Sequence, residues 1–246
     1  MDRMLYVAMS GAKQTALAQA VNSNNLANAN TTGFREDLAA FRSMPVFGPG
    51  SPTRVYAMTE NPGVNLQSGA IQATGRDLDM AIQGNGWIAV QAPDGQEAYT
   101  RAGNLRIESG GLLVTGSGYP VMGNRGPIAI PQAESREIGV DGTITIRGIG
   151  EFANSLTVVD RIKLVNPDGA DLVKGKDGLM RLKDGFEADA DASVRLASGA
   201  LETSNVNTVD AMVNMIALAR QYEAQVKMMK AAGEMASKSN ELLSLS

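Results

Sequence analysis

Residues 206–243 read VNTVDAMVNMIALARQYEAQVKMMKAAGEMASKSNELL, and this stretch decides the architecture of the chain. Apolar or small residues recur in it at alternating steps of three and four, which is the heptad spacing of a packed helix. The stretch has no proline and a single glycine, so we expect one long helix. Four acidic and four basic side chains balance over residues 206–246, so such helices can pack without net repulsion. The heptad positions are Met212, Met215, Ala219, Tyr222, Val226, Met229, Gly233 and Ala236.

The beginning of the chain predicts a second helix. Residues 4–29 are rich in Ala, Met, Gln and Leu, and small or apolar residues recur at helical spacing. Five asparagines crowd between residues 22 and 30, and Gly33 follows. Asn competes with the helical backbone and Gly permits positive φ, so the helix should end there. The stripe consists of Leu5, Met9, Ala12, Ala16 and Ala20.

Neither helix is expected to be stable alone, because a long helix is marginal until its apolar stripe is covered. The N-terminal helix is the natural cover for the C-terminal one, but its stripe is mostly alanine and cannot cover all of the methionine surface. We therefore expect a small-residue antiparallel pair whose remaining apolar surface is buried against other copies or other proteins.

The middle of the chain changes character twice. Residues 34–68 contain four prolines and several small polar residues, which indicates an extended connector. Residues 69–200 carry short β-branched runs bounded by turn dipeptides, such as Asp94-Gly95 and Asp141-Gly142. The predicted fold is α+β: a helix in residues 1–33, the connector 34–68, a central all-β domain 69–200 and a helix in residues 201–246, with the two helices pairing as a coiled-coil-like inner domain.

Composition excludes several classes of function. The 246 residues include no cysteine and no histidine, and the net charge is −4. Imidazole-based catalysis, Cys/His metal sites and general nucleic-acid binding are therefore disfavoured. Gly84-Asn85-Gly86 precedes a strand pattern, whereas a dinucleotide loop opens a helix. Asp77 and Asp79 have no partner base in the sequence and are interpreted as turn carboxylates. We expect no catalytic residues, no cofactor and no metal.

Localisation stays open on the residues alone. The longest apolar run near the start, Met4 to Met9, is too short to span a membrane, and no pattern of a cleaved signal peptide is present. Composition favours the cytoplasm, but the avoidance of cysteine also suits a destination outside it.

Three blocks of sequence lie at the two ends of the chain and at the start of the β zone. The first block is Asn24-Asn25-Leu26-Ala27-Asn28 followed by Thr31-Thr32-Gly33-Phe34-Arg35. The central block includes Leu78-Asp79-Met80-Ala81-Ile82-Gln83-Gly84-Asn85-Gly86-Trp87 and Tyr99-Thr100-Arg101-Ala102-Gly103-Asn104. The last block is Ser204-Asn205-Val206-Asn207, then Met212-Val213-Asn214-Met215-Ile216 and Arg220-Gln221-Tyr222-Glu223. In their sequence and their order these blocks resemble the bacterial flagellar rod and hook proteins.

The resemblance implies a non-enzymatic, self-assembling subunit of the flagellar rod, which transmits torque from motor to hook. The length, the Met1-Asp2 start and Trp87 in place of a more usual Phe are most similar to the proximal rod members. The family also implies terminal helices that are disordered in the monomer and form an inner tube on assembly. Implied partners are other rod proteins, copies of this chain and the flagellar type III export apparatus. The implied location is the basal body within the periplasm, reached without a cleaved signal peptide.

The residues that we expect at the assembly interface come from the two stripes and the two terminal signatures. They are Leu5, Met9, Ala12, Ala16, Asn24, Asn25, Leu26, Ala27, Asn28, Gly33, Phe34, Ser204, Asn205, Val206, Met212, Met215, Ala219, Tyr222, Val226 and Met229. Two alternatives remain at this stage: a distal rod subunit of the same family, and a non-flagellar oligomeric binding module built on the β domain. A peptidoglycan-active enzyme is disfavoured, because no convincing carboxylate pair is present.

Overall fold

The computed structural model describes residues 3–45, 55–60, 63–150, 152 and 155–244. The chain divides into two compact units, each built from pieces that are separate in the sequence. We call residues 1–28, 37–63 and 206–246 the helical unit, and residues 29–36 and 64–205 the sheet unit.

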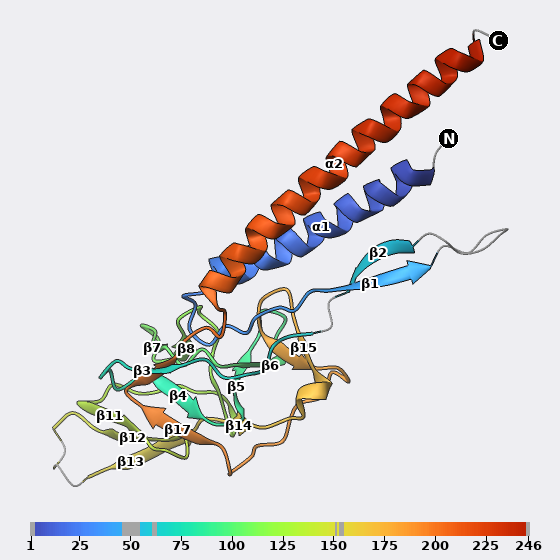
Figure 1. The fold of residues 1–246 in the computed structure, drawn as a ribbon. Helices are drawn as coiled ribbons and strands as arrows, with labels where there is room; N and C mark the ends of the chain where they lie inside the picture. Colours follow the sequence, from blue (N-terminus) through green and yellow to red (C-terminus); the bar gives the residue numbers. More distant parts are fainter. Residues whose placement is uncertain (1–2, 46–54, 61–62, 151, 153–154, 245–246) are drawn as a thin grey trace. The chain divides into compact units, whose positions relative to one another are not determined.

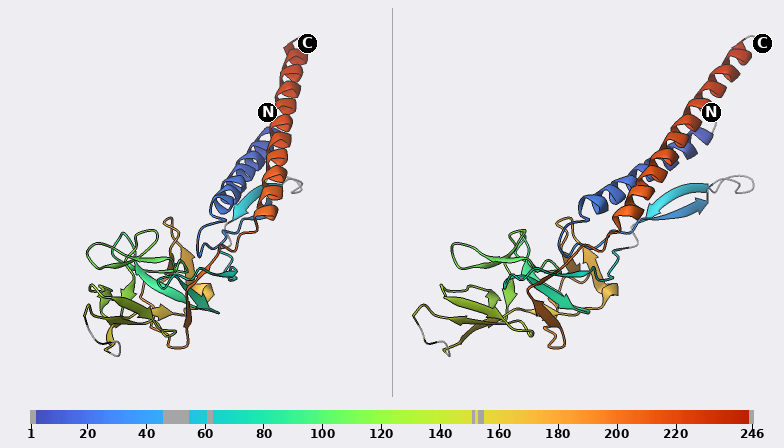
Figure 2. Two further views of the ribbon diagram at one scale, coloured as in Figure 1. Left: turned by 90° about the vertical axis from the view of Figure 1, so that its left-hand side faces the viewer. Right: turned by 60° about the vertical axis from the view of Figure 1, so that its left-hand side comes forward.

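Two antiparallel helices form the helical unit. Helices α1 (Arg3–Ala27) and α2 (Thr208–Ser244) lie side by side, with the two chain ends at the same end of the pair (Figures 1 and 2). The Asn22 side-chain amide donates to the Ala211 carbonyl oxygen at 2.8 Å, and further along the pair Gly11 faces Gln225. Helix α2 has 37 residues and α1 has 25. At about 1.5 Å of rise per residue, the described part of α2 extends roughly 18 Å beyond α1 (Figure 1).

Asparagines mark the last turn of α1 and the first turn of α2. The Asn28 backbone and side-chain amides both donate to the Asn24 carbonyl oxygen, at 3.1 and 2.9 Å, and close the last turn of α1. At the start of α2, the Asn207 side-chain oxygen accepts from the backbone N–H groups of Val209 and Asp210. Asn207 therefore acts as the N-cap that the first turn of a helix requires.

The segment that we expected to be an extended connector contains a hairpin. Strands β1 (Ala40–Pro45) and β2 (Val55–Glu60) pair antiparallel over six residues. The Ser10 hydroxyl of α1 donates to the Ala57 carbonyl oxygen of β2 at 3.5 Å. Prolines favour extended chain without strand pairing, but Pro45 is at the last position of β1, where the ladder ends. Pro49, Pro52 and Pro62 lie outside the described residues.

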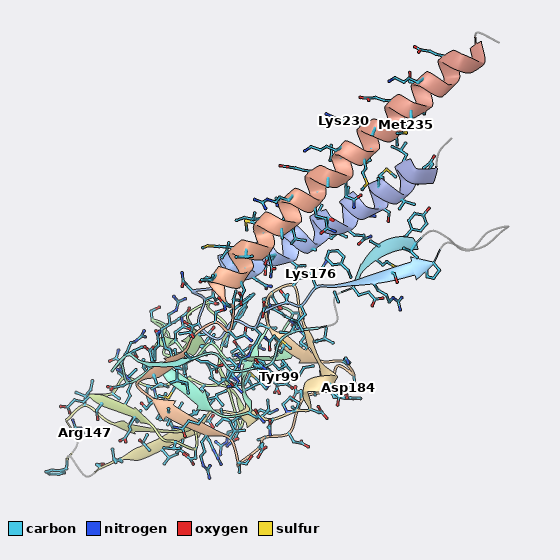
Figure 3. All side chains as sticks on the ribbon, viewed as in Figure 1. Tyr99, Arg147, Lys176, Asp184, Lys230 and Met235 are labelled. Carbon is cyan, nitrogen blue, oxygen red and sulfur yellow. The ribbon has the colours of Figure 1, made fainter. Side chains whose placement is uncertain are left out.

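A five-stranded antiparallel sheet forms the centre of the sheet unit. Its order is β14-β5-β6-β16-β15. Tyr99, labelled in Figure 3, lies in this sheet with its ring buried and its hydroxyl accepting from the Ala188 N–H at 2.7 Å. The strands are β14 (Leu164–Val165), β5 (Trp87–Gln91), β6 (Glu97–Thr100), β16 (Met180–Leu182) and β15 (Leu172–Lys174).

Smaller antiparallel sheets complete the unit. The three-stranded sheet is β11 (Ser135–Ile138), β12 (Thr143–Arg147) and β13 (Thr157–Arg161). The strand pairs are β3 (Ile71–Ala73) with β18 (Ala200–Glu202), β4 (Met80–Gln83) with β17 (Arg195–Ser198), β7 (Leu105–Ile107) with β8 (Leu113–Thr115), and β9 (Met122–Gly123) with β10 (Gly126–Pro127). A 3₁₀ turn, η1, spans Gly169–Asp171. The predicted α+β class, with terminal helices that pack together and a central antiparallel β region, is confirmed.

Candidate functional site

Small side chains form the contact between the two helices. On α1 the buried positions include Ala8, Ala12, Thr15 and Ala18, and on α2 they include Ala211. These residues leave room for the two backbones to approach closely. A Cβ atom at Gly11 would lie only 3.0 Å from the Gln225 side chain, so the absence of a side chain there admits the glutamine.

Many of the large apolar side chains of the pair are exposed instead. Met212, Val213 and Ile216 on α2 are 54, 60 and 56% exposed. Their i, i+1, i+4 spacing places them on one face of the helix. A soluble protein rarely leaves so contiguous an apolar surface exposed unless another molecule covers it. Further large apolar side chains are exposed elsewhere around the two helices. We use the name outward face for the whole exposed set: Leu5, Tyr6, Met9 and Leu17 of α1, with Val209, Met212, Val213, Ile216, Tyr222, Met228 and Met235 of α2.

A groove of about 520 Å³ opens within the helical unit beside this face. It lies between α1, the β1–β2 hairpin and α2. Its lining includes the apolar side chains of Val7, Phe41, Tyr56 and Met228 together with Gln225. The side-chain oxygen of Gln225 is buried and has no hydrogen-bond donor among the described residues.

The predicted interface residues fall into three groups by exposure. Exposed are Leu5, Met9, Ala16, Asn24, Ala27, Met212 and Tyr222. Half-buried are Leu26, Asn28, Gly33, Phe34, Asn205, Met215, Ala219, Val226 and Met229. Buried are Ala12, Asn25, Ser204 and Val206.

The N-terminal stripe read from the sequence differs from the face that α1 turns to α2. Of the stripe residues, only Ala12 is buried in the pair, while Leu5, Met9 and Ala16 are exposed. The stripe that begins at Leu5 and the stripe that begins at Ala8 both have helical spacing and are offset by about one residue. The Ala8 stripe has the smaller side chains and therefore allows the two helices to pack more closely. The expected small-residue antiparallel pair is therefore present, with Ala8, Thr15 and Ala18 in its seam.

Signature asparagines hold together the chain where it leaves the helices. In the helical unit, the Asn25 side chain brackets Asp37: its amide donates to the Asp37 carbonyl oxygen at 2.8 Å, and its oxygen accepts the Asp37 N–H at 2.9 Å. In the sheet unit, the Asn205 oxygen accepts the Glu36 N–H at 2.8 Å. The Asn205 amide donates to the carbonyl oxygens of Asn65 and Gln67, at 2.8 and 2.9 Å. Each asparagine thus satisfies backbone groups that would otherwise lie in irregular structure without partners.

A buried charge cluster lies beside Asn205 within the sheet unit. Glu202 forms ion pairs with Arg35 at 2.7 Å and with Arg101 at 2.9 Å, and the three side chains are 1, 2 and 3% exposed. The second guanidinium nitrogen of Arg101 donates to the Gly84 carbonyl oxygen at 2.7 Å. Both guanidinium groups lie over the Trp87 ring, 5.7 and 5.4 Å from its centroid. We call Arg35, Trp87, Arg101 and Glu202 the arginine–glutamate cluster.

The electrostatics of the cluster are unbalanced. Burial lowers the pKa of the Arg101 guanidinium, the charge of Glu202 opposes this, and the charge of Arg35 adds to it. Nε and Nη1 of Arg35 and Nε of Arg101 are buried without a hydrogen-bond acceptor among the described residues. The face of an indole ring attracts cations, so Trp87 partly offsets the excess positive charge.

Sequence reasoning quoted Arg35, Trp87 and Arg101 within the signatures but gave them no role, and it missed Glu202. A usable signal was present. Arginine is rarely buried unless paired. Arg35 ends the first block and Arg101 interrupts the central one, both among otherwise small, polar or apolar residues. Glu202 is the acidic residue two positions before the C-terminal signature.

The residues weighed for chemistry have structural roles. Asp79 is buried, accepts from the Thr74 hydroxyl at 2.8 Å and pairs with Arg76, whereas Asp77 is exposed. Both were interpreted as turn carboxylates from the sequence, and Asp79 does lie at a local turn, where its N–H donates to the Arg76 carbonyl oxygen at 3.0 Å. Gly84 and Gly86 have φ of 80° and 128° and turn the chain between β4 and β5. Over the described residues, no group of three or more acidic side chains could hold a metal ion.

A search for membrane-crossing segments among the described helices finds none of sufficient length and hydropathy.

Three protein-family models match the chain. "Flagella basal body rod protein" matches residues 5–35, "Flagellar hook protein FlgE/F/G D1 domain" matches 81–146, and "Flagellar basal body rod FlgEFG protein C-terminal" matches 197–242. The arginine–glutamate cluster draws Arg35 from the first segment, Trp87 and Arg101 from the second, and Glu202 from the third.

Flagellar basal-body rod proteins of three bacteria align with all or nearly all of this chain. The flagellar basal-body rod protein FlgF of Escherichia coli strain K12 is 44% identical and that of Salmonella typhimurium strain LT2 is 43% identical, with all of both chains covered in each case. The flagellar basal-body rod protein FlgG of Bacillus subtilis strain 168 is 32% identical, over 95% of this chain and 96% of its own.

Proposed function

This chain belongs to the flagellar basal-body rod protein family, and we propose that the outward face of its helix pair is the surface through which it assembles. It is a structural subunit of the rod in the bacterial basal body, similar to FlgF, the proximal rod protein. Membership of the family supports assembly with other rod proteins. The family is one of structural proteins and not of enzymes.

The observation that carries the proposal is the reversal of side-chain size across the helix pair. Small residues lie in the seam, and large apolar residues such as Met212 and Ile216 face outward. Burying one such side chain contributes roughly 1.5–3 kcal/mol, so the pair is stabilised strongly when a neighbour covers its outward face. A different patch on the neighbour would make the contact heterologous, and a repeated heterologous contact generates rings or helical tubes.

The finer parts of the function follow as proposals. The helical unit forms the inner tube of the rod, and its helices become fully ordered when neighbours cover them. The subunit occupies the periplasm, is exported by the flagellar type III apparatus and transmits torque from motor to hook without catalysing a reaction. The small seam residues support a torsionally stiff tube, because close backbone approach leaves little free space between the helices.

The test is a set of aspartate substitutions on α2. Met212→Asp places a charge on the outward face without touching the seam, so the isolated chain should fold as before while rod assembly and swimming are lost. Val226→Asp and Met229→Asp, at half-buried positions, should also abolish assembly and in addition loosen the pair. Gln221→Asp adds the same charge at an exposed polar position of the same helix, and it should swim.

The measurements are circular dichroism of the purified chains and the recovery of hook–basal bodies from complemented cells. Normal swimming by the Met212→Asp strain would refute the proposed role of the outward face.

A further inference from the structure

Residues 29–36 form a short segment of the sheet unit that is hydrogen-bonded and ion-paired to the rest of that unit. Residues 29–36 belong to this unit although the segments on either side belong to the helical unit. The chain passes between the units at 28/29, 36/37, 63/64 and 205/206. Every covalent path between the units therefore runs through residues 29–36 or through the two ends of residues 64–205.

Backbone hydrogen bonds tie residues 29–36 to the end of the sheet unit. The Gly33 N–H donates to the Glu202 carbonyl oxygen at 2.9 Å, and the Asn205 N–H donates to the Phe34 carbonyl oxygen at 3.3 Å. At two glycines, Gly33 and Gly69, the neighbouring backbone is too close to leave room for a side chain. A Cβ atom at Gly33 would lie 2.3 Å from the Arg101 carbonyl carbon, and one at Gly69 would lie 2.1 Å from the Thr203 carbonyl oxygen.

The Glu202 carboxylate is the point where these pieces meet. One oxygen accepts from the Gly69 N–H at 2.9 Å and pairs with Arg35 at 2.7 Å, and the other pairs with Arg101. A single side chain thus contacts residues 29–36, the start of residues 64–205 and the β6 end that carries Arg101. Lys174 adds a further contact, since its ammonium donates to the Arg35 carbonyl oxygen at 2.8 Å and lies 3.9 Å from the centre of the Phe34 ring.

The composition of the cluster argues against a role in stability alone. Two buried cations share one carboxylate, and three guanidinium nitrogens have no acceptor among the described residues. Apolar side chains of similar volume often replace buried ion pairs with equal or greater stability, and the best-attested reason to keep such pairs is to fix one geometry.

We propose that Glu202 is a positioning residue: it fastens residues 29–36 to both ends of residues 64–205, so that force crossing between the units does not detach them. This inference rests on the proposed function, because the force is the torque that a rod subunit carries. Arg35 and Arg101 pair with the carboxylate, and Trp87 lies against both guanidinium groups. Together with Glu202 they come from the three segments that match the family models.

The test compares two buried glutamates of the same unit in the full-length chain. Glu202→Gln keeps the shape but removes the charge that both arginines need. Glu97→Gln is the matched control, because the Glu97 side chain is 2% exposed and pairs with Lys163 at 2.7 Å away from the cluster. Amide hydrogen exchange is measured at Gly33 and Asn205 and, for reference, at Ala89 in the five-stranded sheet.

Glu202→Gln should speed exchange at Gly33 and Asn205 by about a hundredfold or more relative to Ala89, the opening expected when one partner of a buried pair is lost. Glu97→Gln should not speed exchange at Gly33 and Asn205 relative to Ala89. In cells, Glu202→Gln rods should assemble, but swimming in viscous medium should fail while Glu97→Gln cells swim. Arg35→Met leaves a balanced Arg101–Glu202 pair and serves if Glu202→Gln does not fold. It removes the contact of residues 29–36 with Glu202, so exchange at both Gly33 and Asn205 should again speed relative to Ala89.

Equal exchange at Gly33 and Asn205 in the two glutamine variants would overturn the proposal. So would swimming under load by Glu202→Gln cells. If the wild-type chain were absent from purified basal bodies, the proposed function would fail, and the exchange experiment would still decide whether Glu202 fastens the segments.

Discussion

Replacing Gly33 by alanine should weaken the sheet unit far more than the same change at another glycine with the same backbone conformation. Gly33 has φ of +67° and Gly75 has φ of +72°. Left-handed backbone costs a residue with a side chain about 1–2 kcal/mol, so both variants lose that much. A Cβ atom at Gly75 meets nothing within 4 Å, whereas one at Gly33 would lie 2.3–2.5 Å from the backbone of Arg101 and Ala102.

The clash at Gly33 has a further cost because backbone cannot rotate away. Relieving it moves Gly33 off the Glu202 carbonyl oxygen, which removes a hydrogen bond with a net contribution of about 1 kcal/mol. The same movement strains the Arg101–Glu202 pair. We expect Gly33→Ala to lower the free energy of unfolding by about 3–5 kcal/mol and Gly75→Ala by about 1–2 kcal/mol.

The assay is urea unfolding followed by the fluorescence of Trp87, the single tryptophan of the chain, which lies in the cluster itself. With a slope of about 1–3 kcal/mol per molar urea, the two midpoints should differ by roughly 1 M. Midpoints that agree within error would refute the argument that residues 29–36 pass too close to Arg101 for any side chain.

Two further predictions concern the sheet unit. The hydrogen bond from Arg181 holds the pKa of the Asp177 carboxyl below its usual 3.8, against the opposing effect of burial. A folded-state pKa below the unfolded value stabilises the folded protein at pH above the unfolded pKa, and this stabilisation is lost as the pH falls through the folded pKa. The stability of the wild-type chain should therefore decrease as the pH falls below about 4. Asp177→Asn should make that decrease smaller, as measured by thermal melts at pH 7, 4 and 3. Deleting residues 69–199 should leave subunits unable to form a specific junction, and intact hook–basal bodies from such a strain would contradict this.

Local patterns were sufficient to predict the helices and many turns. The heptad spacing after Val206 predicted α2, and the asparagines between residues 22 and 30 predicted that the first helix ends in that region, where α1 ends at Ala27. Asp94-Gly95 and Asp141-Gly142 do connect antiparallel neighbours, β5 with β6 and β11 with β12. In each case the interactions that fix the conformation lie within a few residues of one another, so the sequence carries the signal locally.

Features that depend on distant contacts were not predictable in the same way. Helical spacing could not distinguish the Leu5 stripe from the Ala8 stripe, because the choice depends on how closely α2 approaches. The β1–β2 hairpin was not predicted, because the prolines near it favour an extended connector. Glu202 pairs with Arg101 and Arg35, which lie 101 and 167 positions earlier in the sequence. No local pattern marks such a cluster before the fold is known.

The most direct test of the account is the reactivity of a single cysteine on the outward face. The chain has no cysteine of its own, so Met212→Cys introduces a unique thiol at an exposed position. We expect this thiol to react rapidly with a maleimide in the isolated chain and to be strongly protected in purified hook–basal bodies, because neighbouring rod subunits cover the face. Equal reactivity in the two states would contradict the claim that this face is the assembly surface.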